Sequence, residues 1–316
     1  MEKEINKVTH VVSFSGGRSS ALLVWLMLIA RKRFNWNVKF IFCDTGVEAP
    51  ATYKFIRDIV KFWRLDDLII LRAKINPVLG QGNSYEIFTP NDLMNSSTMP
   101  PFQPFFDLIK KYGTPSVSRP FCSERMKKNV FDAYCKDHIG DHVTWLGMRS
   151  DEPKRLKTKD GIKYLADLIY VEKQDVLDWW CNQPFDLQLP ENQGNCLYCP
   201  KKSSLKIAAT LRETPHFKAM WDYYIGKNTV RIIEDYDPKV MYRGKLSLDG
   251  VAALYKDVTD DELYSKMKLI KGRDFGECSE SCEPISFGNV NFGEIESNIR
   301  SELEDSFALN QFNLPF

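Results

Sequence analysis

Residues 8–20 read VTHVVSFSGGRSS, and this stretch decides the fold of the chain. The first seven residues, 8–14, are rich in β-branched side chains and run into Ser and Gly, a pattern typical of a buried strand. Residues 19–33 then have the length of a helix and are apolar on nearly all faces, which predicts a helix buried in a layered fold. Gly16 and Gly17 lie between the two elements. They let the backbone turn tightly at a helix start that carries partial positive charge, so we expect a phosphate or pyrophosphate site.

Strands and helices alternate on the C-terminal side of this turn. The pattern predicts further strands at 37–43, 68–72, 142–148 and 166–171, with helices at 51–63 and 123–138. Such alternation implies right-handed crossovers between parallel strands. We therefore predict an α/β fold, with a doubly wound, mainly parallel five-stranded sheet of the Rossmann-like type. Residues 74–120 interrupt the pattern with many prolines, which is typical of a functional lid or a disordered insert.

From residue 172 onward the pattern is mostly helical. The predicted helices are 174–181, 203–212, 216–225, 248–255 and 260–269. A chain of 316 residues has the length of one large domain or two smaller ones. We place a nucleotide-binding α/β domain at 1–171, with the irregular insert 74–120, and a helical C-terminal region at 172–316. That region is either a separate domain or an extension packed on the first.

Composition excludes several classes of protein. With 43% hydrophobic and 27% charged residues, the chain is expected to be globular. Its 43 Lys+Arg against 42 Asp+Glu argue against coating nucleic acid by bulk charge, although a local basic patch stays open. The longest apolar run, 21–30, is too short to span a membrane and lacks the features of a signal peptide. Eight cysteines without an export signal indicate a reduced, cytoplasmic protein with a metal site or a redox cysteine.

Four segments occur together in a recognisable order. They are SGGRSS at 15–20, CDTGVE at 43–48, FCSERMKK at 121–128 and GMRSDEPKR at 147–155. This set resembles the PP-loop proteins of the ATP pyrophosphatase superfamily, and within them the phosphoadenylyl-sulfate reductase-like family, including members carried by phages. The resemblance covers about residues 8–171 and implies a PP-loop type of α/β fold.

The resemblance also implies an adenine nucleotide, either ATP or an adenylyl sulfate. Its site would include Asp44 and Gly147 together with the loop residues Ser15, Gly16, Gly17, Arg18, Ser19 and Ser20. Asp44 ends a parallel strand, where open α/β sheets bind ligands, so it would hold Mg²⁺ or a ribose hydroxyl; the alternative is that it caps the next turn. Arg149 and Arg155 carry guanidinium forks suited to phosphate or sulfate oxygens and are the predicted catalytic cations.

Among the further cations of these motifs are one arginine in the Gly-rich loop and two lysines in the third segment. Arg18 stands where many superfamily members carry an Asp associated with ATP cleavage. This departure argues against ATP cleavage and adds a cation suited to phosphate or sulfate. Lys127 and Lys128 are interpreted as solvated helix charges.

Cys196 and Cys199 form a C-x-x-C pair, which is half of a metal site. The order of Cys122 and this pair resembles the cluster ligands of iron–sulfur adenylyl-sulfate reductases, although Ser123 replaces a second cysteine found there. Cys282, in preference to Cys278, is the predicted fourth ligand. Four thiolates suit Zn²⁺ and a 4Fe–4S cluster equally, and the resemblance favours the iron–sulfur cluster.

The remaining cysteines divide into a reactive one and three structural ones. The pair Glu277-Cys278 resembles the start of the E-C-G-x-H segment of phosphoadenylyl-sulfate reductases, although Ser279 and Ser281 replace its Gly and His. Cys278 is therefore the predicted nucleophile. Three other cysteines are interpreted as small buried hydrophobes: Cys43, Cys135 and Cys181.

The leading functional prediction is an adenylyl-sulfate or phosphoadenylyl-sulfate reductase-like enzyme, in which a thiolate attacks sulfur and a thiol or other electron donor supplies electrons. A second possibility is an ATP-dependent sulfurtransferase that adenylates a nucleic acid or nucleobase for sulfur insertion. A third, from another class, is a non-catalytic nucleotide-binding adaptor. Lys201, Lys202 and Lys206 would meet a polyanion or form an ordinary solvated helix face. The sequence does not decide whether the protein forms a homodimer or binds nucleic acid.

Overall fold

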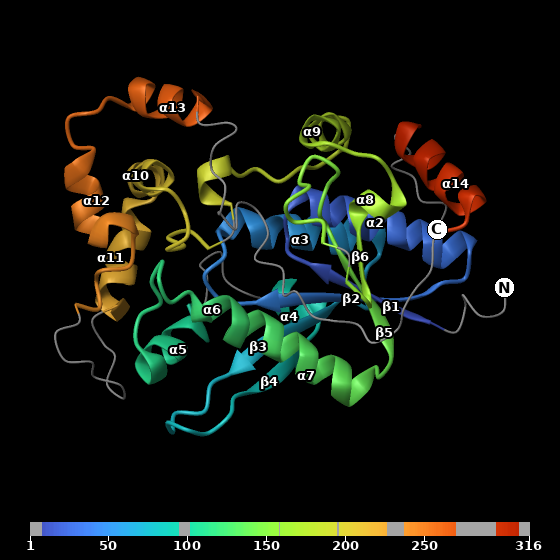
Figure 1. Ribbon diagram of the computed structural model, residues 1–316, viewed down its shortest axis with the longest axis horizontal. Coiled ribbons are helices and arrows are strands. Elements are labelled where there is room, and N and C mark those ends of the chain that lie inside the picture. Colours follow the sequence, from blue (N-terminus) through green and yellow to red (C-terminus); the bar gives the residue numbers. More distant parts are fainter. Residues whose placement is uncertain are drawn as a thin grey trace.

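A central sheet organises the computed structural model, which describes residues 8–94, 102–157, 159–194, 196–225, 237–269 and 295–309 (Figure 1). The sheet has six strands in the order β4-β3-β2-β1-β5-β6. Their bounds are β1 Thr9–Phe14, β2 Asn37–Asp44, β3 Ile69–Lys74, β4 Ser84–Phe88, β5 His142–Leu146 and β6 Ile162–Tyr164. Only β4 is antiparallel to its neighbour. The predicted α/β class and mainly parallel sheet are therefore confirmed.

Two details of the predicted sheet are wrong: the number of strands, five, and the position of the last strand. The segment expected to be an irregular insert contains β4, whose sequence SYEIF pairs along the edge of β3, as well as two helices. The last predicted strand, 166–171, is displaced, because the strand lies at Ile162–Tyr164 and a helical turn follows at once. Asp167 accepts a hydrogen bond from the Tyr164 backbone N–H at 2.8 Å, and this cap starts the turn where the strand pattern alone predicted extended chain.

Helices cover both faces of the sheet and continue beyond it. Their bounds are α2 Arg18–Arg33, α3 Pro50–Trp63, α4 Pro90–Met94, α5 Phe105–Tyr112, α6 Phe121–Ser123, α7 Asn129–His138, α8 Leu165–Leu168, α9 Lys173–Cys181, α10 Ser204–Glu213, α11 Pro215–Ile225, α12 Leu248–Leu254, α13 Asp260–Leu269 and α14 Ser297–Ala308. A π-helical turn, Glu124–Lys128, joins α6 to α7, and 3₁₀ turns lie at Glu191–Gln193 and Arg243–Lys245. None of the described helices is both long and apolar enough to cross a membrane.

The apolar sequence of α2 is explained by its neighbours. All of its residues from Ser20 to Ala30 are buried. The helix packs on β1 and β2 on one side and contacts α9 and α14 on others (Figure 1). A helix enclosed on several sides has no solvent face, so it shows no polar stripe.

Successive residues of the central strands belong alternately to two separate hydrophobic clusters, one on each face of the sheet. Val12 of β1 belongs to the cluster around α2, and Val11 to the cluster on the opposite face, as the alternation of side chains along a strand requires. The C-terminal region contributes to both: Trp179 and Leu303 join the first cluster, and residues of α10–α13 join the second. The region thus shares its core with the sheet, while the boundary at residues 171–172 stays a prediction.

Candidate functional site

The loop between β1 and α2 is held in shape by its own residues. Gly16 has φ +80°, and a Cβ there would lie 2.7 Å from the Thr52 methyl carbon, so this position needs glycine. The hydroxyl of Ser20 accepts from the Ser15 backbone N–H at 3.3 Å and donates to the Gly17 carbonyl at 3.0 Å. Gly17 is the N-cap of α2 and has no side chain with which to cap the first helical N–H groups. The first turn of a long helix thus presents its N–H groups at the carboxyl end of β1.

The end of β5 lies directly against this loop. A Cβ on Gly147 would stand 2.6 Å from the Ser20 Cα and 2.7 Å from the Ser20 nitrogen, so the two backbones touch. Two residues later, Arg149 donates from Nη1 to the Ser19 hydroxyl at 3.2 Å. Close packing of β5 therefore places an arginine on the first turn of α2.

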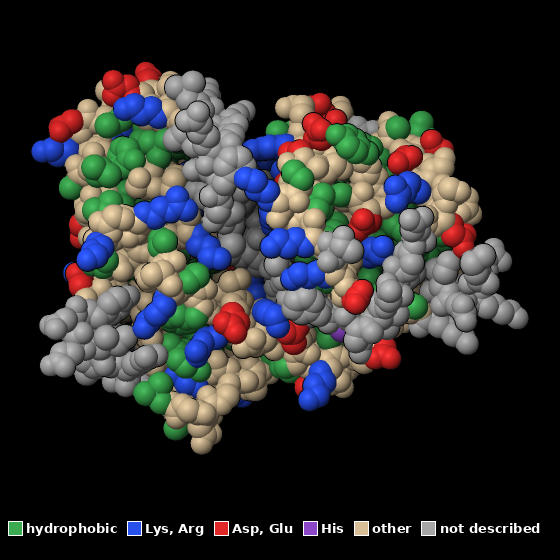
Figure 2. All heavy atoms as spheres, viewed as in Figure 1, with side chains coloured by type: hydrophobic (Ala, Val, Ile, Leu, Met, Phe, Trp, Pro, Cys, Tyr) green, Lys and Arg blue, Asp and Glu red, His purple; other side chains and the backbone are tan. Residues whose placement is uncertain are grey.

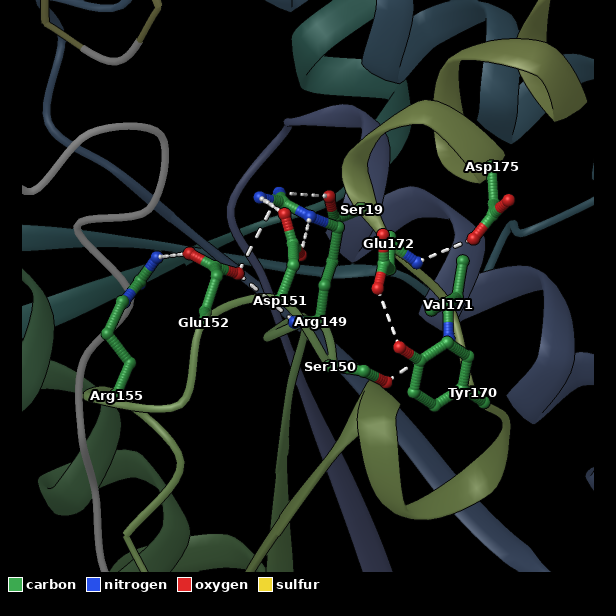
Figure 3. A network of polar contacts seen from close by, with 10 residues as sticks. All are labelled: Ser19, Arg149, Ser150, Asp151, Glu152, Arg155, Tyr170, Val171, Glu172 and Asp175. Carbon is green, nitrogen blue, oxygen red and sulfur yellow. Dashed lines mark hydrogen bonds and ion pairs between the residues drawn. The ribbon is translucent and has the colours of Figure 1, made fainter. Parts of the chain in front are cut away.

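Figure 3 shows how the arginines after β5 are oriented. Arg149 donates from Nε to Asp151 at 2.8 Å, and its backbone N–H donates to Glu152 at 3.1 Å. Arg155 forms an ion pair with the other oxygen of Glu152. Arg149 Nη1 also lies 3.7 Å from Glu152, so the two guanidinium groups share one carboxylate.

These groups line one pocket of about 180 Å³. Its lining includes the whole predicted loop, Gly147, Arg149 and Arg155, which the fold brings together from segments more than 120 residues apart. Five cationic residues and two acidic ones line it: Arg18, Lys127, Arg149, Arg155 and Lys173, with Glu48 and Glu152. Two of the cations also pair with carboxylates outside the lining, Arg18 with Asp186 and Arg149 with Asp151. Lys and Arg side chains also gather toward the middle of the face seen in Figure 2. An excess of positive charge at a helix start favours an anionic ligand.

Asp44 lies below this pocket rather than in its lining. Its carboxylate is completely buried and accepts from Arg72 at 2.6 Å, from the Tyr53 hydroxyl at 2.7 Å and from the Gly46 backbone N–H at 2.8 Å. The contact with Gly46 is a cap of the turn after β2, which was the alternative role predicted for Asp44. Burial, with the nearby Glu48, raises the pKa of Asp44. The proposed Mg²⁺ or ribose contact of Asp44 stays a prediction.

Glu48 reaches the pocket lining from the same motif, although the sequence analysis assigned it no role. Its carboxylate accepts from the Thr45 hydroxyl at 2.6 Å and lies 3.4 Å from Lys127 Nζ. Burial alone would raise the pKa of Glu48, but Lys127 and the hydroxyl groups of Thr45 and Tyr53 outweigh it and lower that pKa. Glu48 is therefore an ionised carboxylate at the pocket floor.

The interpretation of Lys127 as a solvated helix charge is wrong. Its side chain is 5% exposed and lines the pocket, whereas Lys128 lies at the surface beside Asp132 as expected. Both lysines belong to the π-helical turn Glu124–Lys128, whose buried residues are Met126 and Lys127. Nothing in the sequence pattern indicates such a turn.

Arg18 lines the pocket, but its guanidinium is engaged elsewhere. Nε and Nη2 each donate to a different oxygen of Asp186 at 2.8 Å, and Nη2 also donates to the Leu187 carbonyl at 2.6 Å. This is a two-pronged contact to a segment 168 residues away. The structure thus directs the Arg18 fork toward the C-terminal region.

The C-x-x-C segment lies beside the pocket. Cys196 pairs through its backbone with Glu48, and its thiol lies 3.8 Å from the Thr45 hydroxyl. Burial, followed by the charge of the neighbouring Cys196, raises the pKa of Cys122 to about 12. Among the described residues, however, no group of three or more His, Cys, Asp or Glu side chains is placed to hold a metal ion. Cys278 and Cys282 lie outside the described residues.

Four other residues differ in how well they match their predicted positions. Cys43 and Cys135 are buried, as interpreted, but Cys181 is exposed at the end of α9, so that interpretation is wrong. Lys202 is buried and donates to the carbonyls of Asn192 and Leu197 at 2.7 and 3.0 Å. It supports the loop before the C-x-x-C and belongs neither to a solvated face nor to a polyanion contact.

The pocket also has an apolar wall that the sequence analysis missed. Its residues come from α9 and from the chain that follows: Val176, Leu177, Leu187, Leu189 and Pro190. In sequence they look like ordinary core residues. Only the packing of α9 against α2 brings them over the Gly-rich loop.

Comparisons with known proteins agree with this architecture. The profile of the "Phosphoadenosine phosphosulfate reductase domain" matches residues 9–87. The chain is 47% identical over 286 residues to the "Uncharacterized nin region protein ORF290" of Escherichia phage lambda, which covers 90% of this chain and 97% of that protein. It is 22% identical over 229 residues to the "Uncharacterized protein MJ0066" of Methanocaldococcus jannaschii, covering 67% of this chain and 40% of that protein. No solved structure matches the chain.

Proposed function

Since this chain belongs to the phosphoadenosine phosphosulfate reductase-like family, with a phage protein among its relatives, we propose that it is an enzyme acting on an adenine nucleotide that carries sulfur, either adenylyl sulfate or its 3′-phosphorylated form. The Gly-rich pocket binds the nucleotide. A thiol is the electron donor.

One observation carries the proposal: an uncapped helix start and an excess of cations converge on a single pocket at the carboxyl ends of β1 and β5. The first N–H groups of α2 bind the phosphate oxygens, because they point into the pocket without a capping side chain. Arg155 supplies a guanidinium fork toward the same end, and Arg149 holds Ser19 in place. Together these groups orient the phosphate–sulfate end and stabilise negative charge on the departing nucleotide phosphate.

The reaction in this proposal is a thiol reduction of the sulfonate. A thiolate attacks sulfur, forming an S–S bond while the S–O bond to the nucleotide phosphate breaks, and the adenylate leaves with the electron pair. A second thiolate then attacks the thiol sulfur of the S-sulfonate, so that a disulfide forms and sulfite departs. Two thiols are oxidised and one sulfate group is reduced to sulfite. Cys278 stays the predicted first nucleophile.

The test is a binding and product assay with matched arginine and lysine variants. We expect the unmodified protein to bind AMP and adenylyl sulfates and to release sulfite in the presence of a dithiol. Arg155→Gln should weaken the binding of either nucleotide by roughly tenfold, since it removes a charge-assisted hydrogen-bond donor. Lys154→Gln is the control, because it makes the same change of charge at an exposed neighbour outside the pocket lining.

The products also separate the alternatives. Conversion of ATP to AMP and pyrophosphate without sulfite release would favour the ATP-dependent sulfurtransferase. Nucleotide binding with no product would favour the adaptor. A folded protein that binds no adenine nucleotide would contradict the proposal.

The metal site remains a separate proposal, supported by the C-x-x-C spacing of Cys196 and Cys199 and by the electrostatic effect of Cys196 on the Cys122 thiol. If these residues are ligands, a Cys122→Ser, Cys196→Ser variant should lose its bound iron and sulfide, or its zinc, as measured by elemental analysis after anaerobic purification. Cys181→Ser, at an exposed cysteine, should leave the metal content unchanged. Equal metal content in all three proteins would place the site elsewhere or show that there is none.

A further inference from the structure

Two chemically different sets of residues line the pocket. One set is cationic: the arginines and Lys127 beside the Gly-rich loop, and Lys173 on α9. The other is the apolar wall of α9 and the chain after it: Val176, Leu177, Leu187, Leu189 and Pro190. A nucleotide has the same division, because its phosphates are anionic and its base is a flat ring with apolar faces. Ligand sites of this kind combine an apolar lining with a few placed polar groups.

The second half of this wall belongs to a short segment, residues 185–190, here called the strap. Its start is anchored by aromatic packing, since the Phe185 ring lies 5.0 Å from Phe62 and 5.8 Å from Trp180, measured between ring centroids. Leu187 is buried in the cluster around α2, and Leu189 packs against that cluster. Between these anchors the strap is joined to the Gly-rich loop by Arg18.

The contact between Arg18 and the strap has the geometry of a clamp. Two donors of one guanidinium meet the two oxygens of Asp186, and one of them also reaches the Leu187 carbonyl. The Arg18 carbonyl in turn accepts from the Trp180 indole N–H at 3.1 Å, so α9 is joined to the same turn of α2. Both parts of the apolar wall are thus attached to Arg18, one through its side chain and one through its backbone.

We propose that the apolar wall is the subsite for the nucleotide base, and that Arg18 is a positioning residue that holds the strap over the base through Asp186. This inference rests on the proposed function, because it takes an adenine nucleotide as the ligand. It assigns Arg18 a role in base recognition in place of the phosphate contact expected from the sequence. Arginine suits this role because its planar fork pairs with both carboxylate oxygens at once.

The proposal predicts a ratio of affinities rather than one affinity. AMP and ribose 5-phosphate share the phosphate and the sugar, but only AMP has a base. We expect the unmodified protein to bind AMP at least about tenfold more tightly than ribose 5-phosphate, measured by calorimetric titration. Arg18→Gln and Asp186→Asn should each bring this ratio close to one.

Arg18→Gln and Asp186→Asn change the net charge in opposite directions. They therefore distinguish two roles for Arg18: holding the strap, or contacting the phosphate. If Arg18 contacts phosphate, Arg18→Gln weakens both ligands equally, and Asp186→Asn, by releasing the guanidinium, leaves or strengthens both. If Arg18 is a clamp, both variants lose the preference for AMP despite their opposite charges. Leu177→Asn, at a half-buried wall residue, should also lower the ratio while leaving ribose 5-phosphate binding unchanged.

The control is Arg31→Gln near the other end of α2, where Arg31 pairs with Asp67 at the surface. It should keep the ratio of the unmodified protein. Thermal unfolding of each variant reports any general loss of stability, which lowers both affinities together and leaves their ratio unchanged. An unchanged ratio in Arg18→Gln and Asp186→Asn would overturn this inference alone. Failure of the unmodified protein to bind AMP or adenylyl sulfate would instead contradict the proposed function.

Discussion

Gly147→Ala should weaken the binding of adenine nucleotides by roughly 100-fold, the order of effect that a displacement of about 1 Å has on precisely placed groups. The added methyl group would stand 2.6 Å from the Ser20 Cα and 2.9 Å from its Cβ. Both belong to the first turn of a helix whose next ten residues are buried, so that turn has little room to retreat. The loop and the end of β5 must therefore move apart, which displaces the N–H groups that we propose bind phosphate.

The control for this prediction is Gly82→Ala, where an added Cβ meets nothing within 4 Å. Overpacking in a core costs about 1–3 kcal/mol, so Gly147→Ala should also lower the urea midpoint, whereas Gly82→Ala should not. Calorimetric titration at a temperature where both variants are folded separates binding from stability. Nucleotide affinity in Gly147→Ala equal to that of the unmodified protein would contradict the assigned role of the loop.

Lys127→Met should destabilise the fold by about 3 kcal/mol or more. Lys127 and Glu48 are 5% and 2% exposed, and removing one partner leaves a buried, uncompensated charge. The matched control is the neighbouring Lys128→Met, because Lys128 pairs with Asp132 at the surface, where such pairs contribute about 1 kcal/mol or less. Urea unfolding at neutral pH measures both differences.

The pH dependence provides a second readout of the same pair. Lys127 lowers the pKa of Glu48, so in the unmodified protein the ionised carboxylate contributes stability that is lost only as the pH falls through that lowered pKa. Without Lys127, burial raises the pKa of Glu48 and favours its neutral form. The difference in stability between the two proteins should therefore be largest at neutral pH and should shrink on acidification. A difference independent of pH would mean that the substitution acts through packing alone.

Both predictions concern contacts between segments that are distant in the sequence. Glu48 follows β2, Lys127 lies on the π-helical turn, and Cys196 pairs with Glu48 from the C-terminal region. Glu48 and Lys127 line the pocket and Cys196 pairs with Glu48 from beside it, so three parts of the chain meet here. The buried pair of Asp44 and Arg72 lies beside it and joins the ends of β2 and β3.

The local sequence pattern was sufficient to predict the fold class of the protein. The alternation of β-branched strands with helices determined the α/β class, and the position of the glycines located the tight turn between β1 and α2. These features depend on the conformational freedom of glycine and on the period of the apolar residues, which act over a few neighbouring residues. The edge strand β4 was not predicted, because a strand that buries little of its surface shows no clear apolar pattern.

The roles of individual side chains in the pocket were decided by tertiary structure. From the sequence, Arg18 is a cation in the predicted phosphate loop. Its guanidinium points toward the strap only because folding places Asp186 beside it. Lys127 and Lys128 are adjacent and chemically alike in the sequence, yet Lys127 is buried beside Glu48 and Lys128 lies at the surface beside Asp132. The direction of a charged side chain depends on which opposite charge folding brings nearest, and here that partner lies 79 or more residues away: Lys127 meets Glu48, and Arg18 meets Asp186.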